Sequence, residues 1–294
     1  MAAGDSFDTT NLANMIPELW AEPIYKFFYA KLKLRNSVSD YSAMIKNQGD
    51  TIHIPKIALK AAVDKAGSTA LSFTGDSVEG KVDLSIGSHK AVPMLFDDMA
   101  LIQSNSELLT KYAKMAGESL ARAVEDAIWA ELDGFQTTVD VHSSSDNVFD
   151  TDTLEAVLSS LYGQDIDPNT CSMALNNQCL ADFMNPSSGV ASYFIRADAV
   201  GAGNNGDLAT GAVGLVYGMN VFYSRSIASS GTDGTRVGAV YPAEACAFAA
   251  SQDVRVQSEY DVAHLGTKMV ADIIYGVKLI DESGHTMGLN LTNP

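Results

Sequence analysis

Three short segments have the residue types and spacing of ligand-binding motifs, and the clearest of them is a near match to a phosphate-binding loop. Gly75–Lys81 fits the first seven positions of that motif. The next residue is Val82, whereas the motif needs a Ser or Thr hydroxyl to bind magnesium. Asp76 and Glu79 would also place negative charge where phosphates lie, and a strand-like segment follows instead of a helix. The sequence therefore does not predict a nucleotide site.

The other two segments also depart from their motifs at essential positions. Gly201–Gly206 fits G-x-G-x-x-G, but the stretch after it is too rich in glycine for the helix of a dinucleotide site, and no acid lies about 20 residues further on. Asp165–Asn169 resembles the start of a calcium loop, yet the sixth position is Thr170 instead of Gly and the twelfth is Asn176 instead of Glu. We expect a loop at the first segment and a capped turn at the second.

Nucleophiles and metal ligands are scattered along the chain. It contains no G-x-S-x-G nucleophile elbow and no H-E-x-x-H zinc helix. The histidines show no ligand spacing and are interpreted as surface or packing residues: His53, His89, His142, His264 and His285. The three cysteines lack a disulfide pattern and are expected to pack as small apolar residues after cytosolic folding: Cys171, Cys179 and Cys246. The sequence predicts no catalytic residue, cofactor or metal.

Composition narrows the class of protein further. The 294 residues are 46% hydrophobic and 19% charged, which is typical of a folded chain with one large or two small domains. No apolar run reaches the length of about 18 residues needed for a membrane span, and no secretory signal begins the chain. The formal charge of −17, with no cluster of Lys and Arg, argues against tight binding of nucleic acid in general.

The element that must hold the first motif is a predicted ribbon of two strands. Gly49–Lys56 and Val82–Ile86 are strand-like and are expected to pair. The segment between Lys60 and Gly80 is rich in Gly, Ser, Ala and Asp. It is longer than about 12–15 residues, a length beyond which structureless loops are uncommon in a compact domain. A two-stranded ribbon is marginal in water by itself. We therefore expect surfaces outside the subunit's own core to hold it, which indicates assembly.

A long amphipathic helix is predicted directly after the ribbon. Ser104–Glu107 fits a capping box with Ser104 as the N-cap, and Gly134 supplies a stop. Apolar residues recur at helical spacing between them, over roughly 43 Å at 1.5 Å per residue. Glu125 and Asp126 are interpreted as part of a solvated face. We interpret this helix as a structural spine of the subunit.

The remaining segments predict a mixed α+β chain. Residues 1–48 read as an arm whose crowded aromatic side chains must be covered either by their own domain or by a neighbour. A helix capped by Asp152 is expected to end near Gly163, and a shorter one spans Asn177–Met184. Strands are expected at 214–218, 221–223, 237–248 and 254–260, and a strand or strand pair at 269–280.

This order of parts resembles the major capsid proteins of tailed bacteriophages, which have the Hong Kong 97-type fold. Ile16–Trp20 looks like the family's I-P-E-x-W opening, and Gly49–Pro55 looks like its G-D-T-V/I-x-I-P entry to an extended loop. The capped helix from Ser104 occupies the place of the family's spine helix. Gly211–Ser224 is similar to its glycine-spaced stretch before the final strands.

The resemblance implies an N-terminal arm, an extended β-hairpin loop, a long spine helix, and peripheral and axial domains. On this reading residues 1–48 are the arm, 49–95 the extended loop, and 96–150 the peripheral domain with the spine. Residues 151–252 form the axial domain, and 253–294 return to the peripheral domain.

The implied function is a structural shell subunit, not an enzyme. Copies would form pentamers and hexamers of an icosahedral capsid around double-stranded DNA, assembled in the host cytoplasm. A portal, a separate scaffolding protein and a decoration protein are the expected partners. The scaffold is expected to be separate because little chain precedes Ile16. The expected subunit contacts are Trp20, Tyr25, Phe28, Lys60, Lys65, Phe73 and Lys81.

Two alternatives remain open from the sequence. The first is an encapsulin-type compartment, since encapsulins share the fold. The second is a soluble α+β enzyme or binding protein. Some members of the capsid family cross-link through a Lys of the extended loop, but the lysines here lie in no matching motif, so no cross-link is predicted.

Overall fold

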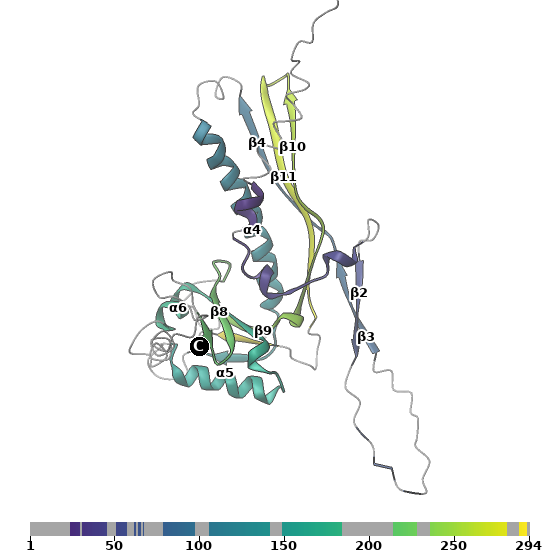
Figure 1. Ribbon diagram of the computed structural model, residues 1–294, viewed down its shortest axis with the longest axis vertical. Coiled ribbons are helices and arrows are strands. Elements are labelled where there is room, and N and C mark those ends of the chain that lie inside the picture. The colour runs from purple at the N-terminus through teal and green to yellow at the C-terminus, as the bar shows by residue number, and fades with distance from the viewer. Residues whose placement is uncertain are drawn as a thin grey trace, which may run out of the picture.

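The computed structural model describes the chain at residues 24–29, 31–45, 51–57, 62, 64–65, 67, 79–97, 106–141, 149–183, 214–227, 236–280 and 288–292. Figure 1 shows an elongated body, in which helix α4 lies along a sheet, and a more compact body that holds α5, α6 and a second sheet. A two-stranded ribbon, β2–β3, lies to one side of both. This mixture of helices and sheets is the predicted α+β class.

The elongated body is built on a four-stranded sheet in the order β1–β10–β11–β4. β10 (Cys246–Asp261) and β11 (Gly266–Leu279) form a long antiparallel hairpin, and β4 (Ser88–Asp97) pairs antiparallel with β11. β1 (Ser39–Asp40), which comes from the arm, pairs parallel with β10. The strands predicted at 254–260 and 269–280 are confirmed, the second as a single strand.

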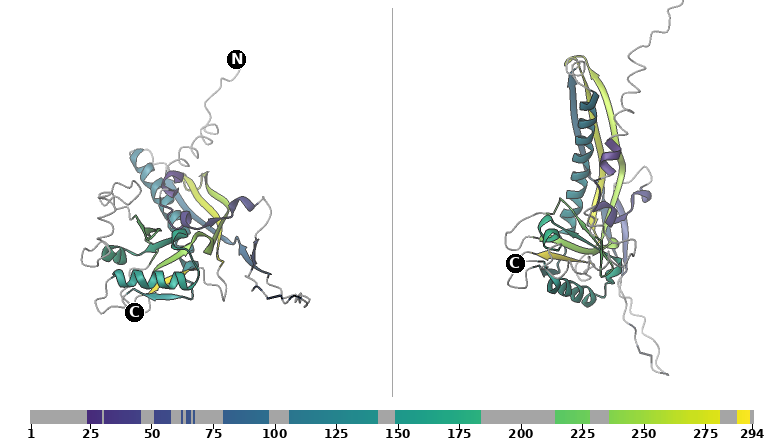
Figure 2. Two further views of the ribbon diagram at one scale, coloured as in Figure 1. Left: turned by 60° about the horizontal axis from the view of Figure 1, so that its bottom comes forward. Right: turned by 60° about the vertical axis from the view of Figure 1, so that its left-hand side comes forward.

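Helix α4 (Ser106–Leu132) runs along this sheet in both views of Figure 2 and confirms the predicted spine. Its 27 residues span about 40 Å at 1.5 Å per residue. The side chains that it buries recur at helical spacing: Ala113, Ala116, Leu120, Ala121, Val124, Ile128 and Leu132. The Gly134 N–H donates to the Glu131 carbonyl at 3.0 Å, just past the helix end. The predicted cap at Ser104 lies outside the described residues.

The compact body contains a six-stranded sheet in the order β5–β12–β9–β6–β8–β7. The strands are β5 (Thr138–Asp140), β6 (Cys171–Leu175), β7 (Leu215–Val216), β8 (Met219–Tyr223), β9 (Arg236–Pro242) and β12 (Leu289–Thr292). The same body contains helices α5 (Thr151–Gly163) and α6 (Asn177–Phe183). A second hydrophobic cluster lies here, separate from the one beneath α4.

The two bodies are joined by hydrogen bonds at the end of α4. The amide nitrogen of Asn290, on β12, donates to the carbonyl oxygens of Asp133 at 3.1 Å and of Phe135 at 3.2 Å. The Arg236 guanidinium, on β9, also donates to the Asp133 carbonyl oxygen. Carbonyl groups at a helix C-terminus have no partner within the helix. Side chains of the six-stranded sheet therefore satisfy the end of the spine.

Two local predictions were wrong. The cap of α5 is Asp150 and not Asp152, because the Asp150 carboxylate accepts from the Thr153 N–H at 3.0 Å. The segment 237–248 is not one strand: the 3₁₀ turn Ala243–Ala245 ends β9 and passes the chain to β10, in the other sheet. The capped turn predicted near Asp165 is confirmed, since Asp167 caps the 3₁₀ turn Pro168–Thr170.

Two of the predicted domain boundaries fall inside strands of the structure. The boundary at 252/253 falls inside β10, and the one at 95/96 falls inside β4. β12 lies within 253–294 yet belongs to the six-stranded sheet with β5 and β9. The assignment of these regions to peripheral and axial domains stays a prediction. Within the part of the chain that the structure describes, no helix is long and apolar enough to cross a membrane.

Candidate assembly surfaces

The arm lies on its own spine helix. Residues 24–29 form a short helix in which Ile24 and Phe28 are buried against the core that α4 covers. Gly117 of α4 permits this contact, because a Cβ added there would lie 2.7 Å from the Ile24 carbonyl oxygen. The alternative left open by the sequence is thus resolved for these two side chains: their own subunit covers them.

Glu125 of α4 holds the turn that follows the short helix. Its Oε1 accepts from the backbone N–H groups of Lys33 at 2.9 Å and Arg35 at 3.2 Å, and its Oε2 accepts from the Leu34 N–H at 3.1 Å. These N–H groups begin the 3₁₀ turn Arg35–Ser37, whose N-terminal donors have no partner in the turn itself. Glu125 is 6% exposed, so its placement on a solvated face was wrong.

Burial raises the pKa of Glu125, and the three N–H donors oppose that shift. Only a carboxylate offers acceptors to all three donors at once, since a protonated oxygen is a poor acceptor. The carboxylate is therefore an internal anion that fixes the arm at a cost in desolvation. We call the contacts of Gly117 and Glu125 with the arm the arm junction.

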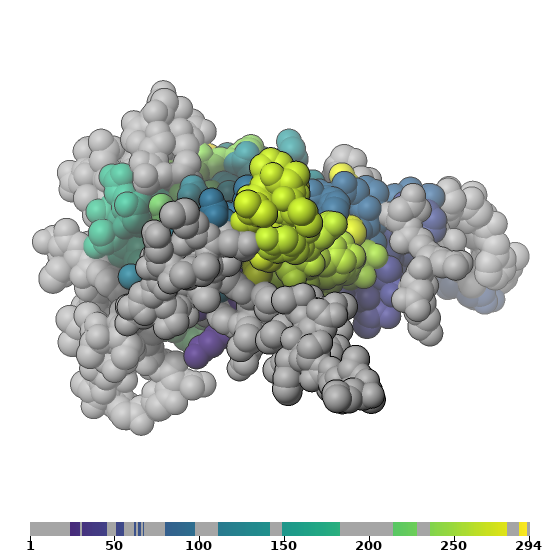
Figure 3. All heavy atoms as spheres, turned by 90° about the horizontal axis from the view of Figure 1, so that it is seen from above, coloured from purple at the N-terminus to yellow at the C-terminus, as the bar shows by residue number. Residues whose placement is uncertain are grey.

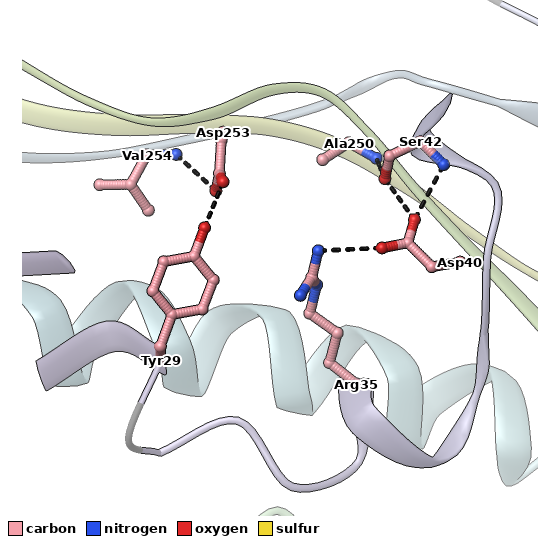
Figure 4. Close-up of polar contacts among 7 residues, drawn as sticks. All are labelled: Tyr29, Arg35, Asp40, Ser42, Ala250, Asp253 and Val254. Carbon is pink, nitrogen blue, oxygen red and sulfur yellow. Dashed lines mark hydrogen bonds and ion pairs between the residues drawn. The ribbon is translucent and has the colours of Figure 1, made fainter. Parts of the chain in front are cut away.

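Polar contacts continue from the arm to β10 (Figure 4). Arg35 donates to Asp40 at 3.2 Å, and the Ser42 hydroxyl accepts from the Ala250 N–H at 2.9 Å. Tyr29 donates to the Asp253 carboxylate, beside the bulge that interrupts the β10–β11 register. Partial burial and this hydrogen bond raise the pKa of Tyr29 to about 12. The arm is thus attached to the helix and to the sheet.

The ribbon has its own attachment. β2 (Thr51–Ile57) and β3 (Glu79–Ser85) pair antiparallel, as predicted. Ile54, Val82 and Leu84 are buried with Ala247 and Ala249 of β10 in a third hydrophobic cluster. Where β3 ends, a Cβ on Gly276 of β11 would overlap the Ser85 carbonyl oxygen. We call the contacts of the ribbon with Ala247, Ala249 and Gly276 the ribbon junction.

On the face opposite the buried side chains, the described part of the ribbon carries charged residues. His53 and Asp83 face each other across the strands at 2.5 Å, and Lys81 pairs with Asp83 at 3.2 Å. These hydrogen bonds, that of His53 first, lower the pKa of Asp83. Figures 1 and 2 show β2 and β3 standing apart from the six-stranded sheet. In the described strands, one face of the ribbon is therefore covered by its own subunit and the other face is exposed.

Large apolar side chains are exposed at the far end of the elongated body. Val262 is 74% exposed and Leu265 is 62% exposed in the turn between β10 and β11. Leu265 has a φ of 44°, a backbone conformation that is uncommon for a side chain of this size. Figure 3 looks onto the yellow-green end of this hairpin, which faces the viewer. An exposed apolar turn of this kind is a candidate contact with another molecule.

A cross-strand ion cluster stiffens the middle of the same sheet. Asp272 of β11 is 3% exposed and accepts from Arg255 Nη2 at 2.7 Å and Arg255 Nε at 3.0 Å. His89 Nε2 lies 2.9 Å from Asp272 Oδ2, the oxygen that also accepts from Arg255 Nη2. The Arg255 guanidinium, with His89, holds the pKa of Asp272 below its usual range against the opposing effect of burial.

The predicted contact residues are only partly within the described chain. Trp20, Lys60 and Phe73 lie outside it. Tyr25 is half-buried against the core beneath α4, and Phe28 is 1% exposed there, so Phe28 has no free surface for a neighbour. Lys65 and Lys81 are exposed. A role of these residues at a subunit interface stays a prediction.

Sequence reasoning missed Glu125, Gly117 and Gly276. The first two carried a signal: Glu125 falls on the buried face set by Ala121, Val124 and Ile128, and a glycine inside a helical pattern often has a packing reason. The cysteines were predicted correctly, since all three are buried and free. Burial raises the pKa of the Cys171 thiol to about 11 and of the Cys179 and Cys246 thiols to about 12.

Solved structures resemble this chain over most of its length. A structure of Mycobacterium phage Che8 matches with a TM-score of 0.67 and 19% identity, covering 88% of this chain and 90% of that one. The capsid of cyanophage P-SCSP1u matches with a TM-score of 0.63 and 13% identity, covering 90% and 88%. A virus-like particle from Pyrococcus furiosus matches with a TM-score of 0.60 and 11% identity, covering 93% and 98%.

Sequence comparison adds nothing to these structural matches. No family model matches the chain, and no curated protein matches it. The arm on the spine helix, the paired ribbon and the long hairpin nevertheless lie within a fold shared over about nine-tenths of the chain. The chain has the Hong Kong 97-type fold of tailed-phage capsid proteins, as its sequence predicted.

Proposed function

We propose that this chain is a structural subunit of an icosahedral viral capsid, whose copies assemble into pentamers and hexamers around double-stranded DNA. The observation that carries the proposal is the shared fold, which extends over 90% of this chain and 88% of a cyanophage capsid protein. Fold alone does not fix function, so the surfaces must support it too.

The surfaces support assembly for a physical reason. In its described strands the ribbon packs on its own subunit with one face and exposes the other, and a two-stranded ribbon needs further packing to be stable. The turn with Val262 and Leu265 offers an apolar contact at the opposite end of the molecule. Contacts that pair different surfaces of identical copies close into rings, and several weak contacts per subunit act together.

The proposed relation to DNA follows from charge. With 36 acidic and 19 basic residues, the chain does not bind DNA tightly, but a shell needs only to enclose it. A separate scaffolding protein, a portal and a decoration protein are the proposed partners. The proposed location is the virion, after assembly in the host cytoplasm. In this role the chain is not an enzyme, and the described residues contain no group of three or more side chains suited to hold a metal.

A second shell function is favoured by one match. The virus-like particle from Pyrococcus furiosus is covered over 98% of its chain, so an encapsulin-type compartment remains the alternative. Particles that co-purify with a protein cargo, and not with DNA, would favour the compartment. The third possibility, a soluble α+β enzyme or binding protein, predicts a monomer or small oligomer in dilute solution.

Deletion of residues 60–80 tests the proposed mechanism. Because the ribbon strands belong to a sheet of their own, we expect the six-stranded sheet to remain folded while assembly fails or gives aberrant products. The measurement is sedimentation with electron microscopy, beside circular dichroism as a control for folding. Normal closed particles from the deletion variant would contradict the role given to the ribbon.

A further inference from the structure

A cavity of about 420 Å³ lies where three segments of the subunit meet. The arm forms one wall, α4 forms the floor, and the turn after β8 forms the other wall. Its size is within the range of roughly 300–1,000 Å³ that is usual for ligand sites. The described lining consists of Lys31, Lys33, Glu118, Ser119, Arg122, Glu125, Tyr223, Ser224, Arg225 and Ser226.

The lining is cationic on a molecule whose formal charge is −17. Four of the lining residues are Lys or Arg, and two are Glu. The carboxylate of Glu125 already accepts three backbone N–H groups, and Glu118 pairs with Lys31 at 3.6 Å. Lys33 and Arg225 form no ion pair with any residue that the structure describes. Lys33 also acts electrostatically on the Glu125 carboxylate, but with four basic and two acidic side chains the lining is net positive.

The side chains of Arg225 and Lys33 suit carboxylates. The Arg225 guanidinium offers paired donors that match a carboxylate, and the Lys33 ammonium is a point charge on a flexible stem. The Lys33 Nζ lies 5.7 Å from the centre of the Tyr223 ring, which keeps it above the cavity wall. A ligand with two carboxylates could engage the arm and the β8 turn together.

We propose that this cavity binds carboxylate side chains from an acidic segment of a second copy of the chain. The inference rests on the proposed shell function, in which each subunit is surrounded by copies of itself. The proposed contact would link the arm, the spine helix and the compact body of one subunit to a neighbouring subunit. Each copy carries 36 acidic residues against 19 basic ones, so suitable carboxylates are abundant on every partner.

Double-stranded DNA fits the cavity less well. A duplex carries one negative charge per about 1.7 Å of its axis, so its charge extends far beyond a site of this volume. Next to the lining residue Arg122 it would meet the exposed acidic side chain of Asp126, which lies 3.8 Å from the Arg122 guanidinium. A short acidic peptide segment brings its charge only where the cations lie.

The test reverses the charges of Lys33 and Arg225, which form no ion pair within the described part of the chain. The double variant Lys33→Glu with Arg225→Glu is compared with Lys90→Glu with Lys111→Glu, which makes the same change in net charge at exposed positions outside the cavity. We expect the cavity variant to raise the critical concentration for assembly roughly tenfold at low salt, a difference that fades near 1 M salt because ions screen exposed pairs. A hexaglutamate peptide should inhibit assembly of the wild-type protein at low salt, whereas inorganic phosphate should not.

The outcomes separate the alternatives. Equal critical concentrations for the cavity variant and its control would overturn the proposal, as would normal assembly with loss only of bound duplex DNA. Hydrogen exchange at residues 33–35 would detect a fold disturbed by charge reversal. In that case the neutral double variant Lys33→Gln with Arg225→Gln replaces the charge-reversed one. The neutral variant should raise the critical concentration for assembly by a smaller factor. Failure of the wild-type protein to form particles under any condition would refute the proposed function itself.

Discussion

Replacing Glu125 by Gln tests how the arm is fixed to the spine. In the native protein two carboxylate oxygens accept from three backbone N–H groups, those of Lys33, Leu34 and Arg35. An amide of nearly the same shape keeps one oxygen, which can still accept from Lys33 and Arg35. Its nitrogen then faces the Leu34 N–H, donor against donor, and the Leu34 residue is fully buried.

The expected magnitude combines a loss and a gain. A hydrogen bond to a charged group contributes about 1.5–3 kcal/mol, and a buried donor left without a partner costs about 1–3 kcal/mol. The neutral amide recovers part of the desolvation cost that raises the pKa of Glu125. A net loss of about 2 kcal/mol is expected, which corresponds to roughly a 30-fold increase in local opening of the arm.

Hydrogen exchange of peptides from residues 31–45, followed by mass spectrometry, measures this opening directly. The matched control is Glu118→Gln on the same helix, because Glu118 forms an exposed ion pair with Lys31 and has no other ion pair among the described residues. Removing such a pair should change stability by less than about 1 kcal/mol. Equal exchange in the two variants would refute the view that Glu125 fixes the arm.

Three further predictions concern the other junctions and the sheet. Gly117→Ala should loosen the arm and speed its hydrogen exchange, although alanine favours helix by about 1 kcal/mol elsewhere, because the new Cβ would press on Ile24. Gly276→Ala should displace the ribbon base and lower the yield of particles on sucrose gradients, since its Cβ would overlap the Ser85 carbonyl. Asp272→Asn should cost about 1–3 kcal/mol near neutral pH in urea unfolding and should flatten the loss of stability on acidification. That loss follows because the pKa of Asp272 is lowered in the folded state, so the contribution of its ion cluster is present above about pH 4 and disappears as pH falls through the folded pKa.

Each of these predictions has a control or a contradicting result. Gly163→Ala is the control for Gly117, and Gly87→Ala is the control for Gly276, because an added Cβ at Gly163 or Gly87 meets no atom within 4 Å. If either test variant behaves like its control, the corresponding junction does not depend on close packing. If the Asp272→Asn variant loses as much stability on acidification as the wild-type protein, other carboxyl groups set the pH dependence of stability.

The elements that could be predicted from sequence are those with a strong local pattern. The spine helix repeats apolar residues at helical spacing over many turns and ends near a glycine, so its existence and length followed from periodicity. The two ribbon segments share an alternating strand pattern, from which their pairing was predicted. Both patterns depend only on residues near one another in the chain.

The features that were missed depend on partners far away in sequence. Glu125 is buried because the arm, about 90 positions earlier, brings N–H groups to it. The break between β9 and β10 at Ala243–Ala245, where the chain changes sheets, did carry a local signal in Pro242, since proline disfavours the interior of a strand. The contacts at Gly117 and Gly276 also arise only when distant backbone segments approach. Local patterns could not predict which segments would meet.

Electron microscopy of the purified wild-type protein, at a resolution that traces the chain in any particle formed, tests the central claim most directly. The account predicts closed shells in which the ribbon beyond its junction lies against a neighbouring copy. A sample that remains monomeric across protein and salt concentrations, or particles in which the ribbon contacts only its own subunit, would contradict it.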